Sequence, residues 1–270
     1  MNHTDRAPGS LTPGGRERRF HLEPFVLEFV GPPGAGKTAV AARLVAELRA
    51  RGITCAERRA PRNPNDGTMV RRVRRAAALL RDRQLTLASL RLAASVRPPS
   101  LVRLARALRL SGWARQFRSY ATSGMEVIVL DQGPLQDAWS LTVPGRCWSE
   151  SAMRAVVWRL LHTTRMGRAF VYVQVDVETA AERLRRRRGS SSRFARLSLA
   201  EMRVWLGTYE RALTSVFEYA GHITNAPCLR LDGSLPIDEA ARNVARFLDD
   251  LLPVTAETLS PAAIASGDRS

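Results

Sequence analysis

The sequence has almost no lysine, few cysteines and no long apolar run. Its 42 basic residues include a single lysine, Lys37, so that the other 41 are arginines. The three cysteines, Cys55, Cys147 and Cys228, are odd in number, far apart and without CxxC spacing. This pattern argues against a disulfide framework and a cysteine-based metal site, and it predicts reduced, structural thiols.

Membrane and export signals are also missing. No apolar run approaches the roughly 18 residues that a membrane-spanning helix requires. The N-terminus has glycine, proline and charged residues where a signal peptide would have its apolar stretch. We therefore expect a soluble, cytoplasmic protein with no membrane partner.

Apolar residues are plentiful enough for a folded core. The chain has 270 residues, of which 45% are hydrophobic, and this suits one large α/β domain or two small ones. Residues 1–21 and 253–270 are rich in Pro, Gly, Ser, Thr and Ala. They have little apolar periodicity, so we expect two disordered tails around a folded domain at 22–252.

The charge of the chain is strongly positive. A formal net charge of +17 would by itself suggest nucleic acid, an anionic membrane surface or a polyanionic substrate as partner. An arginine bias this strong, however, points to genome composition rather than to function. Where arginine fills almost every basic role, a lone lysine indicates chemistry that a guanidinium cannot do. A compact ammonium fits between phosphate oxygens in a tight loop, whereas the planar guanidinium is too broad.

Strands and helices alternate along the folded part. The predicted strands, rich in apolar β-formers, cover residues 25–30, 53–57, 127–130, 170–175 and 229–231. The predicted helices cover residues 37–51, 149–166, 178–188, 198–220 and 237–252. Two or three more are expected over 68–125, broken at Pro98–Pro99 and at Ser111–Gly112. This alternation predicts an α/β fold with a parallel sheet and helices on both faces.

The segment between the first strand and the first helix reads GPPGAGKT and fits the phosphate-binding pattern GxxxxGK[ST]. Its glycines let the backbone curl so that N–H groups point at phosphate oxygens, and the following helix adds its positive end. Lys37 would reach the β- and γ-phosphates, and the Thr38 hydroxyl would coordinate magnesium. We predict that ATP or GTP binds with Mg²⁺ at the following residues: Gly31, Pro32, Pro33, Gly34, Ala35, Gly36, Lys37 and Thr38.

Two acids at strand ends are candidate catalytic residues. Asp131 follows four apolar residues, VIVL, as does the acid that holds magnesium in such folds. It could instead open a turn with Gly133 and Pro134. Because ligands collect at the carboxyl ends of strands in open α/β sheets, we favour the magnesium role. Glu57 ends the second strand and could act as general base on an acceptor hydroxyl, or pair with one of the two arginines that follow it.

Arginines concentrate in two segments. Residues 183–196 contain seven arginines, no acid and the flexible sequence GSSS. We expect 183–197 to form a lid whose Arg183 or Arg187 stabilises the charge of phosphoryl transfer, with a solvated basic helix end as the alternative.

The second segment, 68–125, has thirteen arginines and one acid, Asp82, and is expected to be a helical insert. It could be a solvated face, a docking surface for an anionic acceptor or a nucleic-acid patch. We favour the solvated face, because no aromatic residues stand among the arginines before Trp113.

With these features the chain resembles the thymidylate kinase-like group of P-loop nucleoside and nucleotide kinases from about Phe25 to Leu252. The segments that carry the resemblance are GPPGAGKT, VIVLDQG, VYVQVDVETAAERLRRRRG and LRLDGSLPIDEAARNVARFL. The resemblance implies a P-loop NTPase three-layer sandwich, with a five-stranded parallel sheet in the order 2-3-1-4-5 and an Arg-rich lid. It implies transfer of the γ-phosphoryl group of ATP to an acceptor. It also implies that Asp131 is the acid of the family's Asp-Arg pair, and that the lid arginines are Arg183, Arg187 and Arg193.

The chain departs from this group on the acceptor side. Gln132 stands where the family has the arginine that grips the acceptor's phosphate. Gln132, Gln136 and Asp137 could instead line a pocket for a hydroxyl-rich acceptor such as a nucleoside, sugar or antibiotic. We therefore expect a kinase acting on a small molecule, with a nucleotide-dependent regulatory or nucleic-acid-associated NTPase as the alternative. Nucleic acid is a less favoured partner, and a homodimer stays open.

Overall fold

The computed structural model describes residues 24–58, 82–97, 100–142, 148–163, 166–186 and 197–252. Within these ranges the chain forms a five-stranded parallel sheet with the order β2-β3-β1-β4-β5. The strands are β1 (Phe25–Val30), β2 (Cys55–Arg58), β3 (Val127–Leu130), β4 (Arg168–Gln174) and β5 (Cys228–Asp232). The predicted fold class and the order 2-3-1-4-5 are confirmed.

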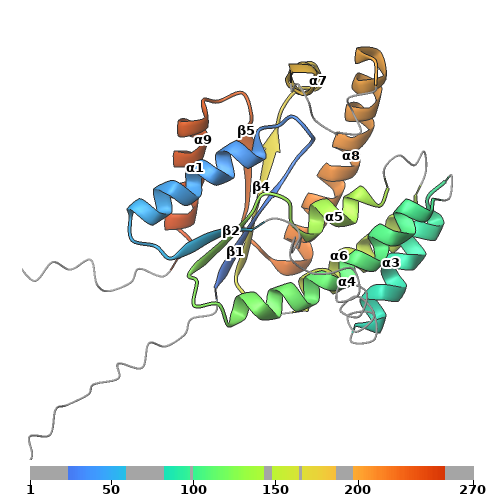
Figure 1. The fold of residues 1–270 in the computed structure, drawn as a ribbon, viewed down its shortest axis with the longest axis horizontal. Coiled ribbons are helices and arrows are strands. Elements are labelled where there is room, and N and C mark those ends of the chain that lie inside the picture. The colour runs from blue at the N-terminus through green and yellow to red at the C-terminus, as the bar shows by residue number, and fades with distance from the viewer. Residues whose placement is uncertain are drawn as a thin grey trace, which may run out of the picture.

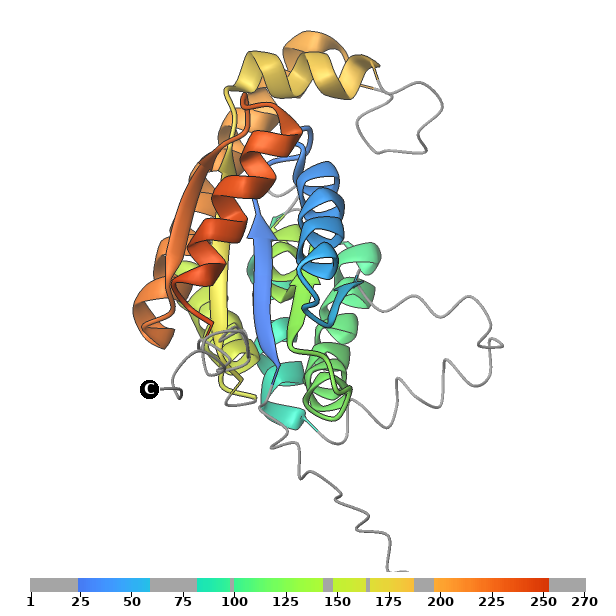
Figure 2. The ribbon, with the colours of Figure 1, turned by 90° about the vertical axis from the view of Figure 1, so that its left-hand side faces the viewer.

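Helices cover both faces of this sheet, as Figures 1 and 2 show. One face carries α1 (Lys37–Ala50) and α9 (Ile237–Asp249), which pack against each other. The other helices are α3 (Arg83–Ser95), α4 (Leu101–Ala121), α5 (Pro134–Ser140), α6 (Glu150–Leu161), α7 (Val177–Arg186) and α8 (Leu199–Thr224). Helices α4, α5, α6 and α8 lie on the second face, and α3 packs on α4 and α6. The sheet is thus the middle layer of three.

The central strands are apolar because they are covered on both sides. Every residue of β3 is buried, and so are five of the six residues of β1. Such strands are expected to read as continuous apolar runs rather than as alternating ones. Glu28 is the exception, because this acid lies inside β1 and is only 2% exposed.

The predicted helix break at Ser111–Gly112 is wrong, because α4 runs without interruption from Leu101 to Ala121. The Ser111 hydroxyl donates to the carbonyl of Leu108 at 2.8 Å, within the helix. Trp113 and Phe117, both fully buried, hold this part of α4 against the core. Tertiary packing therefore overrides the low helix propensity of the Ser-Gly pair.

Helix α5 was not predicted, because Gly133 and Pro134 were interpreted only as a turn. Pro134 instead occupies the first position of α5, where its missing N–H costs nothing. Other element ends shift by a few residues. For example, α6 ends at Leu161 rather than near Met166, and β4 begins at Arg168 rather than Phe170.

Several predictions fall on residues outside the described ranges. These are both tails, residues 68–81 of the insert, the helix break at Pro98–Pro99, residues 187–196 of the lid and Cys147. Cys55 and Cys228 have free thiols, as expected. None of the described helices is both long and apolar enough to cross a bilayer.

Candidate functional site

The loop between β1 and α1 is closely packed by the chain that follows β4. Gly34 has φ +88°, a conformation that side chains rarely adopt. A Cβ at this position would lie 2.6 Å from the carbonyl oxygen of Ala180 in α7. Only glycine therefore fits between the loop and α7, and the first turns of α7 are seated on the phosphate-binding pattern.

Lys37 is the first residue of α1 and is only 8% exposed. Its ammonium donates to the carbonyl of Gly31 at 2.7 Å and to that of Pro32 at 2.9 Å. The side chain thus turns back over the loop and fills the inside of its curve with positive charge. The N-terminal end of α1 adds a partial positive charge at the same place, so the loop suits an anion.

Thr38 and Asp131 meet beside this loop. The Thr38 hydroxyl donates to Oδ2 of Asp131 at 2.9 Å, and Asp131 is 1% exposed. They come together because β3, which ends just before Asp131, pairs with β1. A hydroxyl and a carboxylate at this spot suit magnesium, which commonly takes one or two carboxylates together with substrate phosphates. The described residues contain no group of three or more His, Cys, Asp or Glu that would hold a metal alone.

Helix α7 brings one predicted lid arginine to the loop that follows β5. Arg183 donates from Nη1 to the carbonyl of Gly233 at 2.9 Å. A Cβ at Gly233 would lie 3.1 Å from the carbonyl oxygen of Ala35, so this second loop abuts the phosphate-binding one. Arg183 therefore lies near the candidate site. Arg187 and Arg193 are outside the described residues.

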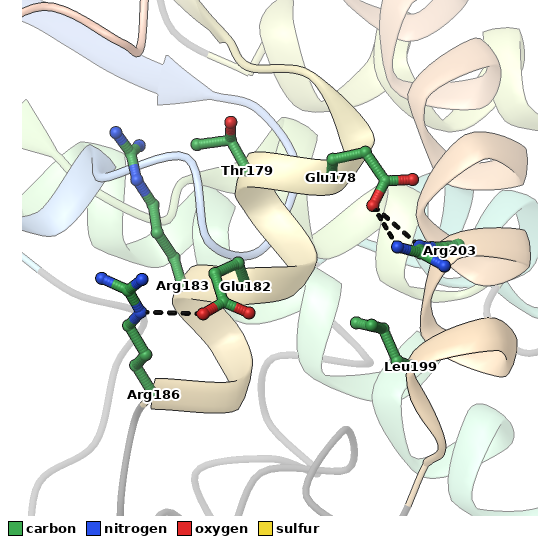
Figure 3. A pocket seen from close by; sticks show the side chains of 7 residues that line it. All are labelled: Glu178, Thr179, Glu182, Arg183, Arg186, Leu199 and Arg203. Atoms are coloured by element: carbon green, nitrogen blue, oxygen red, sulfur yellow. Dashed lines mark hydrogen bonds and ion pairs between the residues drawn. The ribbon is translucent and has the colours of Figure 1, made fainter.

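A cavity of about 410 Å³ lies between α7 and the start of α8 (Figure 3). It is lined by Glu178, Thr179, Glu182, Arg183, Arg186, Leu199 and Arg203. Glu178 turns toward Arg203 and forms an ion pair at 2.6 Å, which ties α7 to α8. Hydrogen bonds from Arg185 and Arg186 lower the pKa of Glu182 to about 2. Much of the positive charge at the end of α7 is thus already paired within the helix.

Glu57 lies one strand farther from the phosphate-binding loop than Asp131 does. It belongs to β2, which β3 separates from β1, and it aligns with Val129, two positions before Asp131. Its side chain is half-buried. Glu57 thus shares the carboxyl edge of the sheet with Asp131, while its role as a base stays a prediction.

The three residues expected to line an acceptor pocket differ in their surroundings. Gln132 is exposed, whereas Gln136 is 9% exposed and its Oε1 has no hydrogen-bond partner among the described residues. The Asp137 carboxylate accepts a hydrogen bond from the indole N–H of Trp113 at 2.8 Å. Burial raises the pKa of Asp137, and this hydrogen bond, Arg109 and Arg106 counteract the rise. Gln132 is thus the one of the three that solvent reaches freely.

Sequence reasoning missed a buried pair of opposite charges under α5. Glu28 of β1 is 2% exposed and Arg168 of β4 is 7% exposed. Burial raises the pKa of Glu28 to about 8, although backbone N–H groups and Arg168 act in the opposite direction. The signal was present in the sequence, since one glutamate interrupts the otherwise apolar run FVLEFV.

The sequence matches a known protein family. A family model described as an AAA domain matches residues 26–212, which is more than half of the chain. The matched region runs from β1 into α8 and includes the phosphate-binding loop, Asp131 and Arg183. No curated protein matches the sequence.

Proposed function

The chain belongs to the AAA domain family, a group of P-loop NTPases that includes many nucleotide and nucleoside kinases, and from this premise we propose that it is a kinase. It transfers the γ-phosphoryl group of ATP or GTP, with Mg²⁺, to a small-molecule acceptor. The observation that carries the proposal is the position of Lys37. The only lysine of the chain is buried inside the curve of the phosphate-binding loop, beside the Thr38–Asp131 contact.

The residues of the loop have separate tasks in this proposal. The backbone from Gly31 to Thr38 holds the phosphates, and Lys37 moves from its two carbonyl partners to β- and γ-phosphate oxygens. Thr38 and Asp131 would hold the magnesium ion, which would supply positive charge against the negative charge that develops on the phosphates. The fit rests on the glycine-only space at Gly34 and on the buried carboxylate beside a hydroxyl.

Two further roles complete the proposed transfer. Arg183, with Arg187 and Arg193 of the lid, stabilises negative charge on the transferred group and excludes water. Glu57 accepts the proton of the acceptor hydroxyl. Arg183 is supported by its link to Gly233 beside the loop, and Glu57 by its place at the carboxyl edge of the sheet.

The acceptor in this proposal is a hydroxyl compound rather than a nucleoside monophosphate. Gln132, the exposed residue after Asp131, occupies the place of the arginine that grips a phosphate in thymidylate kinase-like enzymes. A neutral amide donates and accepts hydrogen bonds but brings no charge for a phosphate. This proposal therefore uses the resemblance to thymidylate kinase-like enzymes for the donor side only.

A second candidate function rests on the basic helices α3 and α4. Six exposed arginines of the α3–α4 region make no ion pair within the described part of the chain: Arg83, Arg91, Arg97, Arg109, Arg115 and Arg118. A nucleotide-dependent protein that contacts nucleic acid would use such a surface. Titrating random DNA at rising salt tests it, since phosphate contacts weaken steeply with ionic strength.

The kinase proposal is tested by ADP release over a broad panel of nucleosides, sugars, antibiotics and nucleoside monophosphates. At least one hydroxyl acceptor should raise turnover well above that of Lys37→Ala, which lacks the phosphate-binding ammonium. Arg242→Ala removes an exposed cation on α9 and should behave as wild type. If no acceptor raises turnover above the Lys37→Ala level, the chain is not a kinase. If only monophosphates work, the acceptor class is wrong.

A further inference from the structure

Glu28 reaches from the central strand to the first turn of α5. Its Oε1 accepts hydrogen bonds from the backbone N–H of Leu135 at 2.8 Å and from that of Gln136 at 3.3 Å. In the sheet, Glu28 aligns with Leu130 of β3 on one side and with Phe170 of β4 on the other. The carboxylate therefore sits under the point where the chain leaves β3 and turns into α5.

The Glu28 carboxyl group caps the N-terminus of α5. The first N–H groups of a helix have no partner within the helix, and a side chain just before it commonly accepts from them. Gly133 precedes α5 and has no side chain, while Pro134 has no N–H. Glu28 supplies the acceptor from a strand more than a hundred residues away.

Gly133 makes the approach of the carboxylate possible. A Cβ at this position would overlap with the carboxyl group of Glu28. Glycine at position 133 therefore leaves the space that the Glu28 side chain occupies.

Arg168 supports Glu28 from the neighbouring strand. Its guanidinium is buried and lies 4.3 Å from the centre of the Phe117 ring of α4. Burial lowers the pKa of Arg168 to about 10, and the charge of Glu28 acts in the opposite direction. The pair thus links the strand of the phosphate loop to α4 and α5 on the second face.

We propose that Glu28 is a positioning residue which, by holding the first turn of α5, fixes Asp131 against Thr38. Only Gln132 and Gly133 separate Asp131 from α5, so this short segment is fixed between the end of β3 and the capped turn. Without the cap, α5 keeps its packing and the Asp137–Trp113 hydrogen bond, but its first turn loses the two hydrogen bonds nearest to Asp131, so the direction of the Asp131 carboxylate is less tightly fixed. The inference rests on the proposed function, since it assigns Asp131 to magnesium.

The proposal predicts that loss of the Glu28 cap affects magnesium binding but not metal-free nucleotide binding. The phosphate loop and Lys37 belong to β1 and α1 and do not depend on α5, so nucleotide binding without metal should be retained. Magnesium binding depends on Asp131 and should weaken. Removing a residue that orients a metal ligand typically costs about 10- to 100-fold in metal affinity.

Two conservative variants test whether reach or charge matters. Glu28→Gln keeps an oxygen at the same reach but cannot carry a charge opposite Arg168, whereas the wild-type carboxyl group becomes charged as pH rises through its pKa of about 8. Glu28→Asp keeps the charge but is one methylene too short for the N–H groups of α5. Binding of a fluorescent ATP analogue is measured first in EDTA and then during a Mg²⁺ titration. We expect Glu28→Asp to need at least about tenfold more Mg²⁺, and Glu28→Gln to stay within about threefold of wild type.

The outcomes separate the inference from the proposed function. If wild type fails to bind the analogue, the proposed function fails and the inference with it. If wild type binds but Glu28→Asp needs no more Mg²⁺, only the inference fails. An impaired Glu28→Gln beside a normal Glu28→Asp would mean that Glu28 acts through its charge on Arg168. An equal loss of metal-free binding would show a merely structural role. Either result overturns the inference.

Discussion

Glu28 is a buried acid whose protonation should be visible in the pH dependence of stability. Burial moves its pKa from 4.5 to about 8, and the charged groups that face it are Arg168 on β4 and Asp137 on α5. The folded protein therefore holds this proton more tightly than the unfolded chain does. It follows that the free energy of unfolding decreases as pH rises from about 4.5 to about 8.

Glu28→Gln should remove that part of the decrease. The difference in Tm between variant and wild type should shift by several degrees in the variant's favour between pH 5.5 and pH 8.5, as measured by thermal unfolding. Glu239→Gln, at an exposed site on α9, should follow the wild-type pH profile in parallel. A Tm difference for Glu28→Gln that stays constant over this range would show that Glu28 titrates in its ordinary range.

Each part of the candidate donor side has its own local sequence pattern, so its residues could be predicted one by one. GPPGAGKT is one uninterrupted pattern between a strand and a helix, and Asp131 directly follows an apolar strand. The Glu28 cap was not predictable in the same way. It joins residues more than a hundred positions apart, and only the packed sheet brings Gly133 over a carboxylate of β1.

At the scale of elements, two glycines illustrate how packing decides what a sequence pattern cannot. Gly112 was predicted to break a helix and lies inside α4, with nothing within 4 Å of where its Cβ would be. Gly133 was considered only as part of a possible turn after Asp131, and in the structure it leaves room for Glu28. Substitution by alanine should therefore have opposite effects at the two positions.

Gly112→Ala should stabilise the protein by about 0.5–1 kcal/mol, because alanine restricts the unfolded chain and suits a helix interior. Gly133→Ala should destabilise it by about 1–3 kcal/mol, because the methyl group displaces the Glu28 carboxylate. Urea unfolding of both variants measures the two effects. If Gly112→Ala is the destabilising one, α4 is not continuous in solution.

The second element-scale feature is the seating of α7 on the phosphate loop. Gly34→Ala places a methyl group against the Ala180 carbonyl at a φ of +88°. We expect it to abolish binding of the fluorescent ATP analogue, because the loop must open away from α7 to accept the methyl group. Gly52→Ala also lies at positive φ, +82°, but has open space around its Cβ. It should lose some stability and keep nucleotide affinity, and equal binding by Gly34→Ala would contradict the close packing.

At the scale of the whole molecule, charges of opposite sign are unevenly placed. Arg43–Asp238 and Arg51–Asp249 connect α1 to α9, and Arg203–Glu178 connects α8 to α7. The six exposed arginines of the α3–α4 region named above have no such partners among the described residues. The positive charges of the α3–α4 region therefore repel one another at low ionic strength.

Added salt should accordingly stabilise the protein. Tm should rise by a few degrees between about 10 mM and 300 mM NaCl, because the screening length shortens from about 30 Å to below about 8 Å and the repulsion weakens. The triple variant Arg91→Gln, Arg115→Gln, Arg118→Gln should start with a higher Tm and respond less. Arg51→Gln, which loses two acidic partners, should start lower. A wild-type Tm that falls with salt would mean that attraction between charges outweighs repulsion.

The lone lysine has a chemical consequence. Reagents that acylate amines can react with only one side chain in the whole protein, that of Lys37. Its nitrogen donates hydrogen bonds to two backbone carbonyls of the phosphate-binding loop. Apart from the terminal amine, each modified molecule is therefore labelled at the candidate site itself. Protection by nucleotide can be followed by mass spectrometry as the loss of a single mass increment on the intact chain. The fraction of protected chains then gives the fraction of sites that hold nucleotide.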